Sequence, residues 1–269
     1  MSISPRPFLK WAGGKSRLIA QYQSYLPPKY QTYYEPFIGG GALFFHLQPS
    51  RAVLCDINPD VVNVYICIRD RVEEVIRGLQ HHSTHHSQDY YYQTRANIPS
   101  SPAEKAARLI YLNKTCFNGL YRVNAQGEFN VPMGRYKNPK ICDPELLRTA
   151  SFALKETLIL ERPFEAILDD RTLPQDFIYF DPPYHPLSET SNFTSYSRHA
   201  FSTEHQVRLR DVFAQLAQKG VQVMQSNSDC PFIRDLYQDF QIYTIEAARS
   251  INSNCSKRGK ITEVLITSY

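Results

Sequence analysis

The chain reads Phe177-Ile178-Tyr179-Phe180-Asp181-Pro182-Pro183-Tyr184 in its second half, and this stretch decides the fold. Its first four residues are apolar, and each is aromatic or β-branched. Such a run is typical of a strand buried on both faces of a parallel sheet. The two prolines cannot extend the hydrogen-bonded ladder, so the strand ends at this corner. Open α/β sheets bind ligands at the carboxyl ends of their strands, which predicts a ligand site here.

The corner after the strand would present two hydrogen-bond acceptors and one aromatic face. The acceptors are the Asp181 carboxylate and the Pro182 carbonyl, and the ring is that of Tyr184. This set suits an amino group on a planar heterocycle, because the acceptors take its N–H bonds while the ring stacks on it. A stiff turn without a binding role is the alternative interpretation, since Asp and Pro are common in turns.

The composition is that of a soluble globular protein, with 42% hydrophobic and 21% charged residues. No apolar run approaches the ~20 residues of a membrane helix, and the N-terminus lacks the apolar stretch of a signal peptide. We therefore expect a cytosolic protein. The six cysteines show no zinc-like spacing, which predicts free thiols. The cluster at residues 81–86 contains four histidines in a polar stretch, with no carboxylate or cysteine in metal-site spacing, so we expect a solvated loop and no metal.

Charge is concentrated in one segment of the chain. The net charge is only +4, but residues 114–140 carry five Lys or Arg against a single acid, Glu128. Aromatic residues are interleaved with these cations. Basic and aromatic side chains on one short stretch are typical of a nucleic-acid-binding surface. A solvated basic face is the alternative interpretation.

Two glycine-rich turns lie near the N-terminus. The loop at residues 8–16 superficially resembles a P-loop, but Leu9 stands where its first glycine is required, which excludes that motif. After a short strand, Gly39 and Gly41 match two positions of a dinucleotide fingerprint, whereas Phe44 occupies the third. Asp56 ends the next strand at a spacing that suits ribose hydroxyls, although an acid there equally serves as a helix cap. Together they favour a nucleoside site.

The pattern changes to helical over residues 59–145, with apolar positions at helical spacing near 61–68 and 103–112. The α/β pattern then resumes, with strands expected near 157–160, 177–180, 221–224, 240–244 and 263–267, and a helix over 203–218 that Gly220 ends. We therefore predict a Rossmann-like α/β domain at 1–58 and 146–269, with an inserted, mainly helical domain at 59–145.

These elements together resemble the D12 class of DNA adenine N6-methyltransferases, most closely the Dam-type enzymes that act on GATC. The resemblance covers nearly the whole chain in one motif order. It rests on Phe-Leu-Lys-Trp-Ala-Gly-Gly-Lys at 8–15, Glu-Pro-Phe-Ile-Gly-Gly-Gly at 35–41, Asn-Gly-Leu-Tyr-Arg at 118–122, Gly-Glu-Phe-Asn-Val-Pro-Met-Gly-Arg-Tyr at 127–136, Asp-Pro-Pro-Tyr at 181–184, Asn-Phe-Thr at 192–194 and Arg-Ser-Ile-Asn-Ser-Asn at 249–254.

The resemblance implies an S-adenosylmethionine-dependent enzyme without a metal, acting on double-stranded DNA in the cytoplasm, in association with the nucleoid. The oligomeric state stays open, and the built-in recognition domain favours a monomer. The residues it implies for catalysis are Asp181, Pro182, Pro183 and Tyr184. Those for the methyl donor are Trp11, Ala12, Gly13, Lys15, Glu35, Pro36, Phe37, Gly39, Gly41, Asp56 and Asp181. Those for DNA are Lys10, Lys114, Phe117, Asn118, Leu120, Arg122, Asn124, Asn130, Pro132, Arg135 and Asn192.

Particular roles also follow from the resemblance. Arg122 is similar to the family's guanine reader, whose fork bonds O6 and N7 in the major groove. Phe117 stands where the family often has a tyrosine that wedges into the base stack. The target adenine would leave the helix and meet the methyl donor at Asp181. Other amino acceptors, such as cytosine N4, an RNA adenine or a glutamine amide, and a DNA-binding regulator without catalysis are the alternatives. Replication and restriction-modification roles both stay open.

Overall fold

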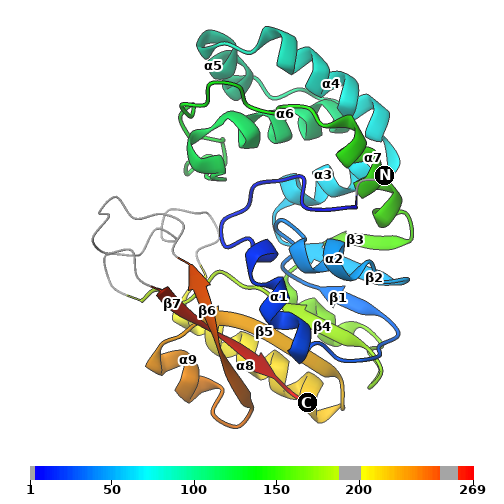
Figure 1. Cartoon of the computed structure of the whole chain (residues 1–269), viewed down its shortest axis with the longest axis vertical. Coiled ribbons are helices and arrows are strands. Elements are labelled where there is room, and N and C mark those ends of the chain that lie inside the picture. Colours follow the sequence, from blue (N-terminus) through cyan, green and yellow to red (C-terminus); the bar gives the residue numbers. More distant parts are fainter. Residues whose placement is uncertain (1–3, 188–200, 249–259) are drawn as a thin grey trace.

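The centre of the molecule is a twisted sheet in the strand order β3-β2-β1-β4-β5-β7-β6 (Figure 1). The computed structural model describes residues 4–187, 201–248 and 260–269. The strands are β1 Tyr33–Glu35, β2 Ala52–Asp56, β3 Thr157–Glu161, β4 Phe177–Phe180, β5 Gln222–Ser228, β6 Gln241–Ala248 and β7 Lys260–Thr267. The five strands β3, β2, β1, β4 and β5 run parallel to one another. Strand β7 lies between β5 and β6 and runs antiparallel to both.

Strand β4 lies between β1 and β5 and is buried on both faces, as the sequence predicts. Phe177 and Tyr179 face the hydrophobic cluster that contains α2 and α3, while Ile178 and Phe180 face the cluster that contains α8. From β1 the chain runs outward to β2 and β3, then returns to β4 on the other side. Strand order therefore reverses between β1 and β4. Open sheets bind ligands at this reversal, so the carboxyl ends of β1 and β4 are where a site is expected.

The helices are bounded by recognisable signals. They are α1 Ile19–Tyr22, α2 Ala42–Leu47, α3 Pro59–Asp70, α4 Val72–His85, α5 Gln88–Ala96, α6 Pro102–Thr115, α7 Pro144–Leu154, α8 Thr203–Gln218 and α9 Pro231–Leu236. Asn58 caps α3 by accepting from the backbone of Asp60, with Pro59 at the first helical position. Helix α8 has the predicted bounds, and Gly220, at φ 76°, follows its end in the left-handed conformation.

The helical segment predicted as an insert lies at one end of the molecule, where α4, α5 and α6 pack together away from the sheet (Figure 1). Helix α3 contacts β2 and β3 on one side and α6 on the other. One hydrophobic cluster runs without a break from Tyr33 and Leu54 in the sheet to Ile110 in α6. The sheet and the helical segment are thus joined through α3. We propose that residue 58 is the boundary between the sheet domain and the inserted helical domain.

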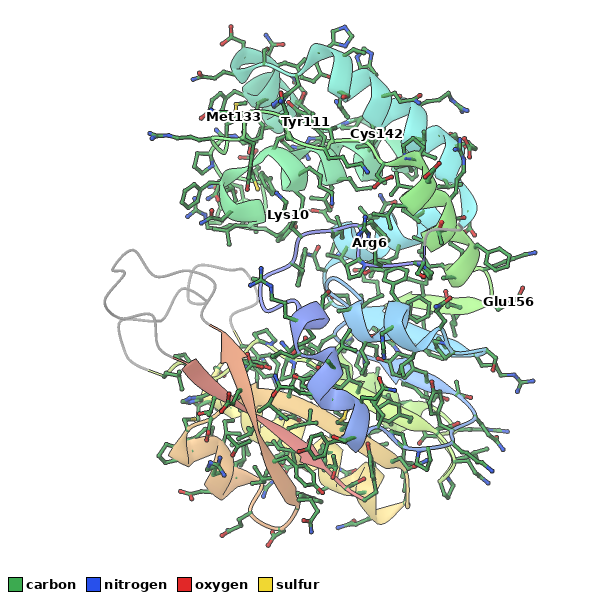
Figure 2. The ribbon with its side chains drawn as sticks, viewed as in Figure 1. Arg6, Lys10, Tyr111, Met133, Cys142 and Glu156 are labelled. Atoms are coloured by element: carbon green, nitrogen blue, oxygen red, sulfur yellow. The ribbon has the colours of Figure 1, made fainter. Side chains whose placement is uncertain are left out.

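The histidine cluster departs from its prediction, because it is helical. Helix α4 extends through His85, and His82 is half-buried, with its ring 4.7 Å from that of Tyr111 (labelled in Figure 2) and its Nδ1 2.7 Å from the Tyr90 hydroxyl oxygen. Burial lowers the pKa of His82 to about 4. Polar composition favoured a loop, but helical spacing places this ring on an aromatic surface. Within the described residues, no group of three or more His, Cys, Asp or Glu side chains is arranged to hold a metal ion.

Only short helical turns follow the first glycine-rich loop. A single 3-10 turn at Lys15–Arg17 precedes the four-residue α1. Among the described residues, none of the helices is both long and apolar enough to cross a bilayer.

Candidate functional site

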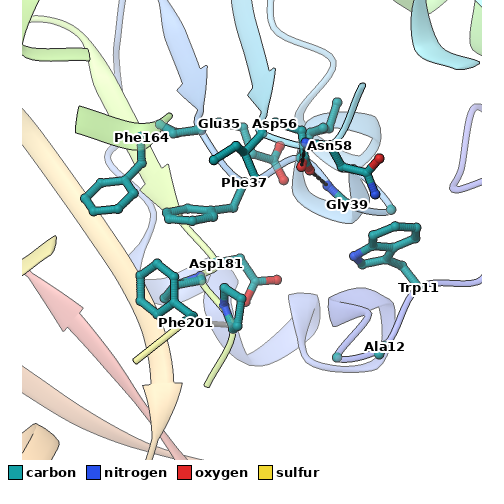
Figure 3. Close-up of a pocket in the computed structure, with 18 of the residues that line it drawn as sticks. Trp11, Ala12, Glu35, Phe37, Gly39, Asp56, Asn58, Phe164, Asp181 and Phe201 are labelled. Atoms are coloured by element: carbon teal, nitrogen blue, oxygen red, sulfur yellow. Dashed lines mark hydrogen bonds between the residues drawn. The ribbon is translucent and has the colours of Figure 1, made fainter. Parts of the chain in front are cut away.

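A cavity of about 1240 Å³ opens at the carboxyl ends of β1, β2 and β4. Pockets that hold one drug-sized ligand usually measure about 300–1,000 Å³, so this one has room for more than a single small molecule. Figure 3 shows Trp11, Gly39, Asp56 and Asn58 on one side of it, and Phe37, Phe164, Phe201 and Asp181 on the other. All the residues predicted for the donor and for catalysis line it. The structure therefore brings these two predicted sets together.

The glycine turn after β1 needs glycine for two reasons. Gly39 and Gly41 have φ values of 43° and 63°, which side chains disfavour. The Trp11 ring also packs on Gly39 so closely that an added Cβ would lie 2.5 Å from its Cδ1. The turn is tied to Asp56, whose carboxylate accepts from the Gly39 backbone N–H at 3.2 Å and from that of Asn58 at 2.9 Å. Asp56 is thus held at the pocket wall.

Glu35, at the end of β1, is a buried carboxyl group in this pocket. It is 2% exposed, and the Tyr33 hydroxyl donates to its Oε2 at 2.7 Å. Burial raises the pKa of Glu35 to about 8, and the Asp181 carboxylate adds to the rise. Near neutral pH its side chain is therefore largely protonated. Asp56 and Asp181 line the same cavity, and a positively charged ligand beside Glu35 would favour its ionised form.

Asp181 has a partner that the sequence did not reveal. The Lys15 ammonium, 3% exposed, lies 2.9 Å from Asp181 Oδ1 and donates to the Gly13 carbonyl at 2.6 Å. It also lies 4.5 Å from the centre of the Tyr184 ring. Lys15 thus makes the contacts with carboxylate and aromatic face that the sequence assigned to a substrate amino group. Lys15 lines the cavity with the other residues predicted for the donor, and it also reaches the Asp181-to-Tyr184 corner.

The corner itself is anchored by neighbouring strands and helices. Ser226 of β5 donates to Asp181 Oδ1 at 2.8 Å, and the Tyr184 hydroxyl donates to Glu263 of β7 at 2.7 Å. Gln206 of α8 donates to the Pro183 carbonyl at 2.9 Å. Burial and the Asp181 carboxylate raise the pKa of Tyr184 well above its ordinary value, so the hydroxyl stays protonated. The Asp181 and Tyr184 side chains are therefore fixed from β5 and β7 respectively.

Several pocket residues were missed from the sequence. Phe164 follows β3 and stacks on Phe37 with ring centres 5.4 Å apart, and Phe201 meets Phe37 edge-on at 5.8 Å. These rings form an aromatic wall suited to a planar group. The signal was present, because Pro163 and Phe164 follow a strand end just as Pro183 and Tyr184 do. The other missed residues include Arg162, Tyr121, Val123, His205 and Arg208.

Lys10 joins the first glycine-rich loop to the helical segment (Figure 2). Its backbone N–H donates to Asn113 Oδ1 at 2.7 Å, and Asn113 Nδ2 donates back to the Lys10 carbonyl at 2.7 Å. The same amide donates to the Gly119 carbonyl at 3.0 Å. The Lys10 ammonium lies 4.2 Å from the centre of the Tyr136 ring. Lys10 therefore lies beside the predicted DNA-binding segment.

Most of the other residues predicted for DNA lie on or near that segment. Phe117 is 51% exposed, and Arg122 is exposed with its Nε donating to Asn130 Oδ1 at 2.7 Å. Lys114 is half-buried, and burial with the nearby Lys10 charge lowers its pKa to about 8. Asn118, Pro132 and Arg135 are exposed, and Leu120 and Asn124 are half-buried. Asn192 and the motifs at 192–194 and 249–254 lie outside the described residues.

A family model and several known proteins that match nearly the whole chain are all methyltransferases or methylases by name. Residues 11–251 match the family model for the D12 class N6 adenine-specific DNA methyltransferase. The type II methyltransferase M1.LlaDCHI of Lactococcus lactis subsp. cremoris is 48% identical, covering 99% of this chain and 96% of its own length. Type II methyltransferase M.MjaIII of Methanocaldococcus jannaschii is 39% identical, over 98% of this chain and 99% of its own length. The DNA adenine methylase of Escherichia coli strain K12 is 36% identical, over 97% of this chain and 94% of its own length.

Proposed function

The chain belongs to the D12 class of N6 adenine-specific DNA methyltransferases, and from this premise we propose that it methylates adenine N6 in double-stranded DNA within GATC, using S-adenosylmethionine. The observation that carries the proposal is the joint position of the Asp181-to-Tyr184 corner and the glycine turn on one cavity. A base and a methyl donor could share that space.

The cavity fits the methyl donor in shape and charge. The donor supplies a methyl group on a positively charged sulfur. The Asp56 and Asp181 carboxylates suit such a cation, and Glu35 can ionise beside it. Asp56 is placed to hold ribose hydroxyls, because its carboxylate is fixed at the end of β2 beside the glycine turn. Phe37 and Phe164 offer flat faces for a nucleoside base.

In the proposed reaction, the catalytic corner acts on the target amino group. Asp181 and the Pro182 carbonyl would accept its N–H bonds, which draws the nitrogen lone pair out of conjugation with the ring. The amino group would replace the Lys15 ammonium, which now occupies the Asp181 carboxylate. Tyr184 would stack on the base while Glu263 holds its hydroxyl. Positioning in a fixed, low-dielectric corner supplies most of the rate enhancement.

Recognition of DNA is assigned to the segment around Arg122. Its exposed guanidinium can bond O6 and N7 of one guanine, a pair worth about 1–3 kcal/mol of discrimination. Phe117 is an exposed aromatic side chain that can enter the base stack. The adenine would be flipped out of the helix at an unstacking cost of a few kcal/mol. Two observations support these contacts: the Arg122 and Phe117 side chains are exposed, and their segment lies beside Lys10.

The proposal is tested with purified protein, labelled S-adenosylmethionine and short duplexes that differ by one base pair. Label should enter the GATC duplex and appear as N6-methyladenine after digestion to nucleosides. Duplexes altered at the guanine, the adenine or the thymine serve as controls. Label in methylated cytosine, or equal labelling of all duplexes, would show that the proposed substrate is wrong.

A further inference from the structure

Residues 121–130 form a short hairpin between the donor pocket and the proposed DNA surface. Val123 and Phe129 form an antiparallel bridge, and the Asn130 N–H donates to the Arg122 carbonyl at 3.0 Å. Successive side chains of an extended chain point to opposite sides. Tyr121 and Val123 accordingly line the donor pocket, while Arg122 between them is exposed. Two adjacent residues therefore serve two different surfaces.

Tyr121 ties the hairpin to the far wall of the pocket. Its hydroxyl donates to Asp60 Oδ2 at 2.8 Å and lies 3.4 Å from Asn58 Oδ1, both in the first turn of α3 or its cap. Its ring lies 5.5 Å from that of Trp11, with the planes at 31°. Burial and the Asp60 carboxylate raise the pKa of Tyr121, so its hydroxyl remains a donor. The hairpin is thus held by one polar and one aromatic contact.

Both contacts lead directly to groups that face the donor. Asn58 donates its backbone N–H to Asp56 Oδ1, the carboxylate assigned to the ribose. Trp11 packs on Gly39, whose N–H donates to the other oxygen of Asp56. Tyr121 therefore stands two contacts from Asp56 through Asn58, and three through Trp11 and Gly39. A ligand that fixes Asp56 or Trp11 also fixes the position of the hairpin that carries Arg122.

We propose that Tyr121 couples methyl-donor binding to recognition of the DNA site, so that each ligand tightens the binding of the other. The inference rests on the proposed function, because it needs a donor in the pocket and DNA at Arg122. A hairpin already positioned by the donor loses less conformational freedom when Arg122 meets its base. Thermodynamic linkage makes the effect equal in both directions. Tyr121 is a positioning residue, since it acts through Trp11 and through Asp60 and Asn58, which are themselves hydrogen-bonded.

Binding measurements with a non-reactive donor analogue, sinefungin, test this coupling without turnover. Trp11 is the only tryptophan of the chain, so its fluorescence reports occupancy of the pocket. Sinefungin is titrated with and without a GATC duplex, and the duplex with and without sinefungin. In the wild-type protein each ligand should lower the dissociation constant of the other by the same factor, about 5-fold or more. In Tyr121→Phe the factor should fall to about 1 or 2, while binding of sinefungin alone changes less.

Three variants exclude a merely structural effect. Tyr92→Phe changes an exposed tyrosine elsewhere in the helical segment and should keep the wild-type coupling factor. Asp60→Ala should lower the factor as Tyr121→Phe does. In the double variant Tyr121→Phe with Asp60→Ala, the coupling factor should fall no further than in either single variant, because the two side chains act as a pair. Circular dichroism melting confirms that each variant is folded.

The outcomes separate this inference from the proposed function. An unchanged coupling factor in Tyr121→Phe, or a wild-type factor of about 1, would overturn the role of Tyr121 even if the protein methylates adenine. Absence of methyl transfer by the wild-type protein would overturn the proposed function, and it is observed in the separate labelling assay. Additive losses in the double variant would show that Tyr121 does not act through Asp60.

Discussion

Replacing Glu35 by Gln is expected to remove a pH dependence of stability that arises from one buried carboxyl group. The pKa of Glu35 is about 8 in the folded protein against 4.5 for an ordinary glutamate, because burial disfavours the charged form. Between these two values the folded state holds a proton that the unfolded state has released. The stability that Glu35 contributes is therefore complete below about pH 4.5 and is lost as pH rises through about 8.

The magnitude follows from the linkage relation. Each pH unit in that interval changes the unfolding free energy by about 1.4 kcal/mol, so about 3 kcal/mol is lost between about pH 5.5 and about pH 9. Gln is neutral and of the same shape, and the Tyr33 hydroxyl can still donate to its side-chain oxygen. The variant should lack this contribution. All other titrating groups are shared by the two proteins and cancel in the comparison.

Urea denaturation of both proteins across that pH range measures the effect. The wild-type free energy of unfolding should fall relative to that of Glu35→Gln by about 3 kcal/mol from the acid to the alkaline end. A difference that stays constant with pH would show that Glu35 is already ionised in the folded protein. Glu35 would then not be the neutral carboxyl group that its burial predicts.

Three further substitutions test other parts of the site. Lys15→Gln should lower the unfolding free energy by about 3 kcal/mol in urea, because it leaves the Asp181 carboxylate without its buried partner; unchanged stability would contradict the ion pair. Gly39→Ala should weaken sinefungin binding by about tenfold or more in a fluorescence titration, since the added Cβ would strike Trp11; wild-type affinity would contradict that packing. Arg122→Ala should reduce discrimination at one guanine by about 5-fold to 150-fold in competition binding, whereas equal loss on all sequences would indicate a phosphate contact.

Local signals in the sequence were enough to predict the elements that build the pocket. The apolar run before Asp181 predicted a doubly buried strand, and β4 is one. The glycines at 39 and 41 predicted a turn after a short strand, and Asp56 was expected at the end of the next strand; both are observed. These features succeed because proline, glycine and buried apolar runs restrict the backbone wherever they occur.

Contacts between distant parts of the chain could not be predicted in this way. Lys15 and Asp181 meet only because the first loop folds over the carboxyl end of β4. Phe164 enters the pocket because β3 pairs parallel with β2, so its carboxyl end lies at the same side of the sheet as those of β1 and β2. Local patterns do not specify this strand order. The error at His82 has the same origin, since the aromatic surface that receives its ring belongs to α6.

Product analysis of wild-type protein and Asp181→Ala on one GATC duplex tests the central claim most directly. Both proteins are incubated with S-adenosylmethionine, and the DNA is digested to nucleosides for mass spectrometry. We predict N6-methyladenine from the wild-type protein and a rate lower by about a thousandfold or more in the variant, the cost of losing a group that stabilises the transition state. Methylcytosine as the product, or a variant as fast as the wild type, would contradict the account.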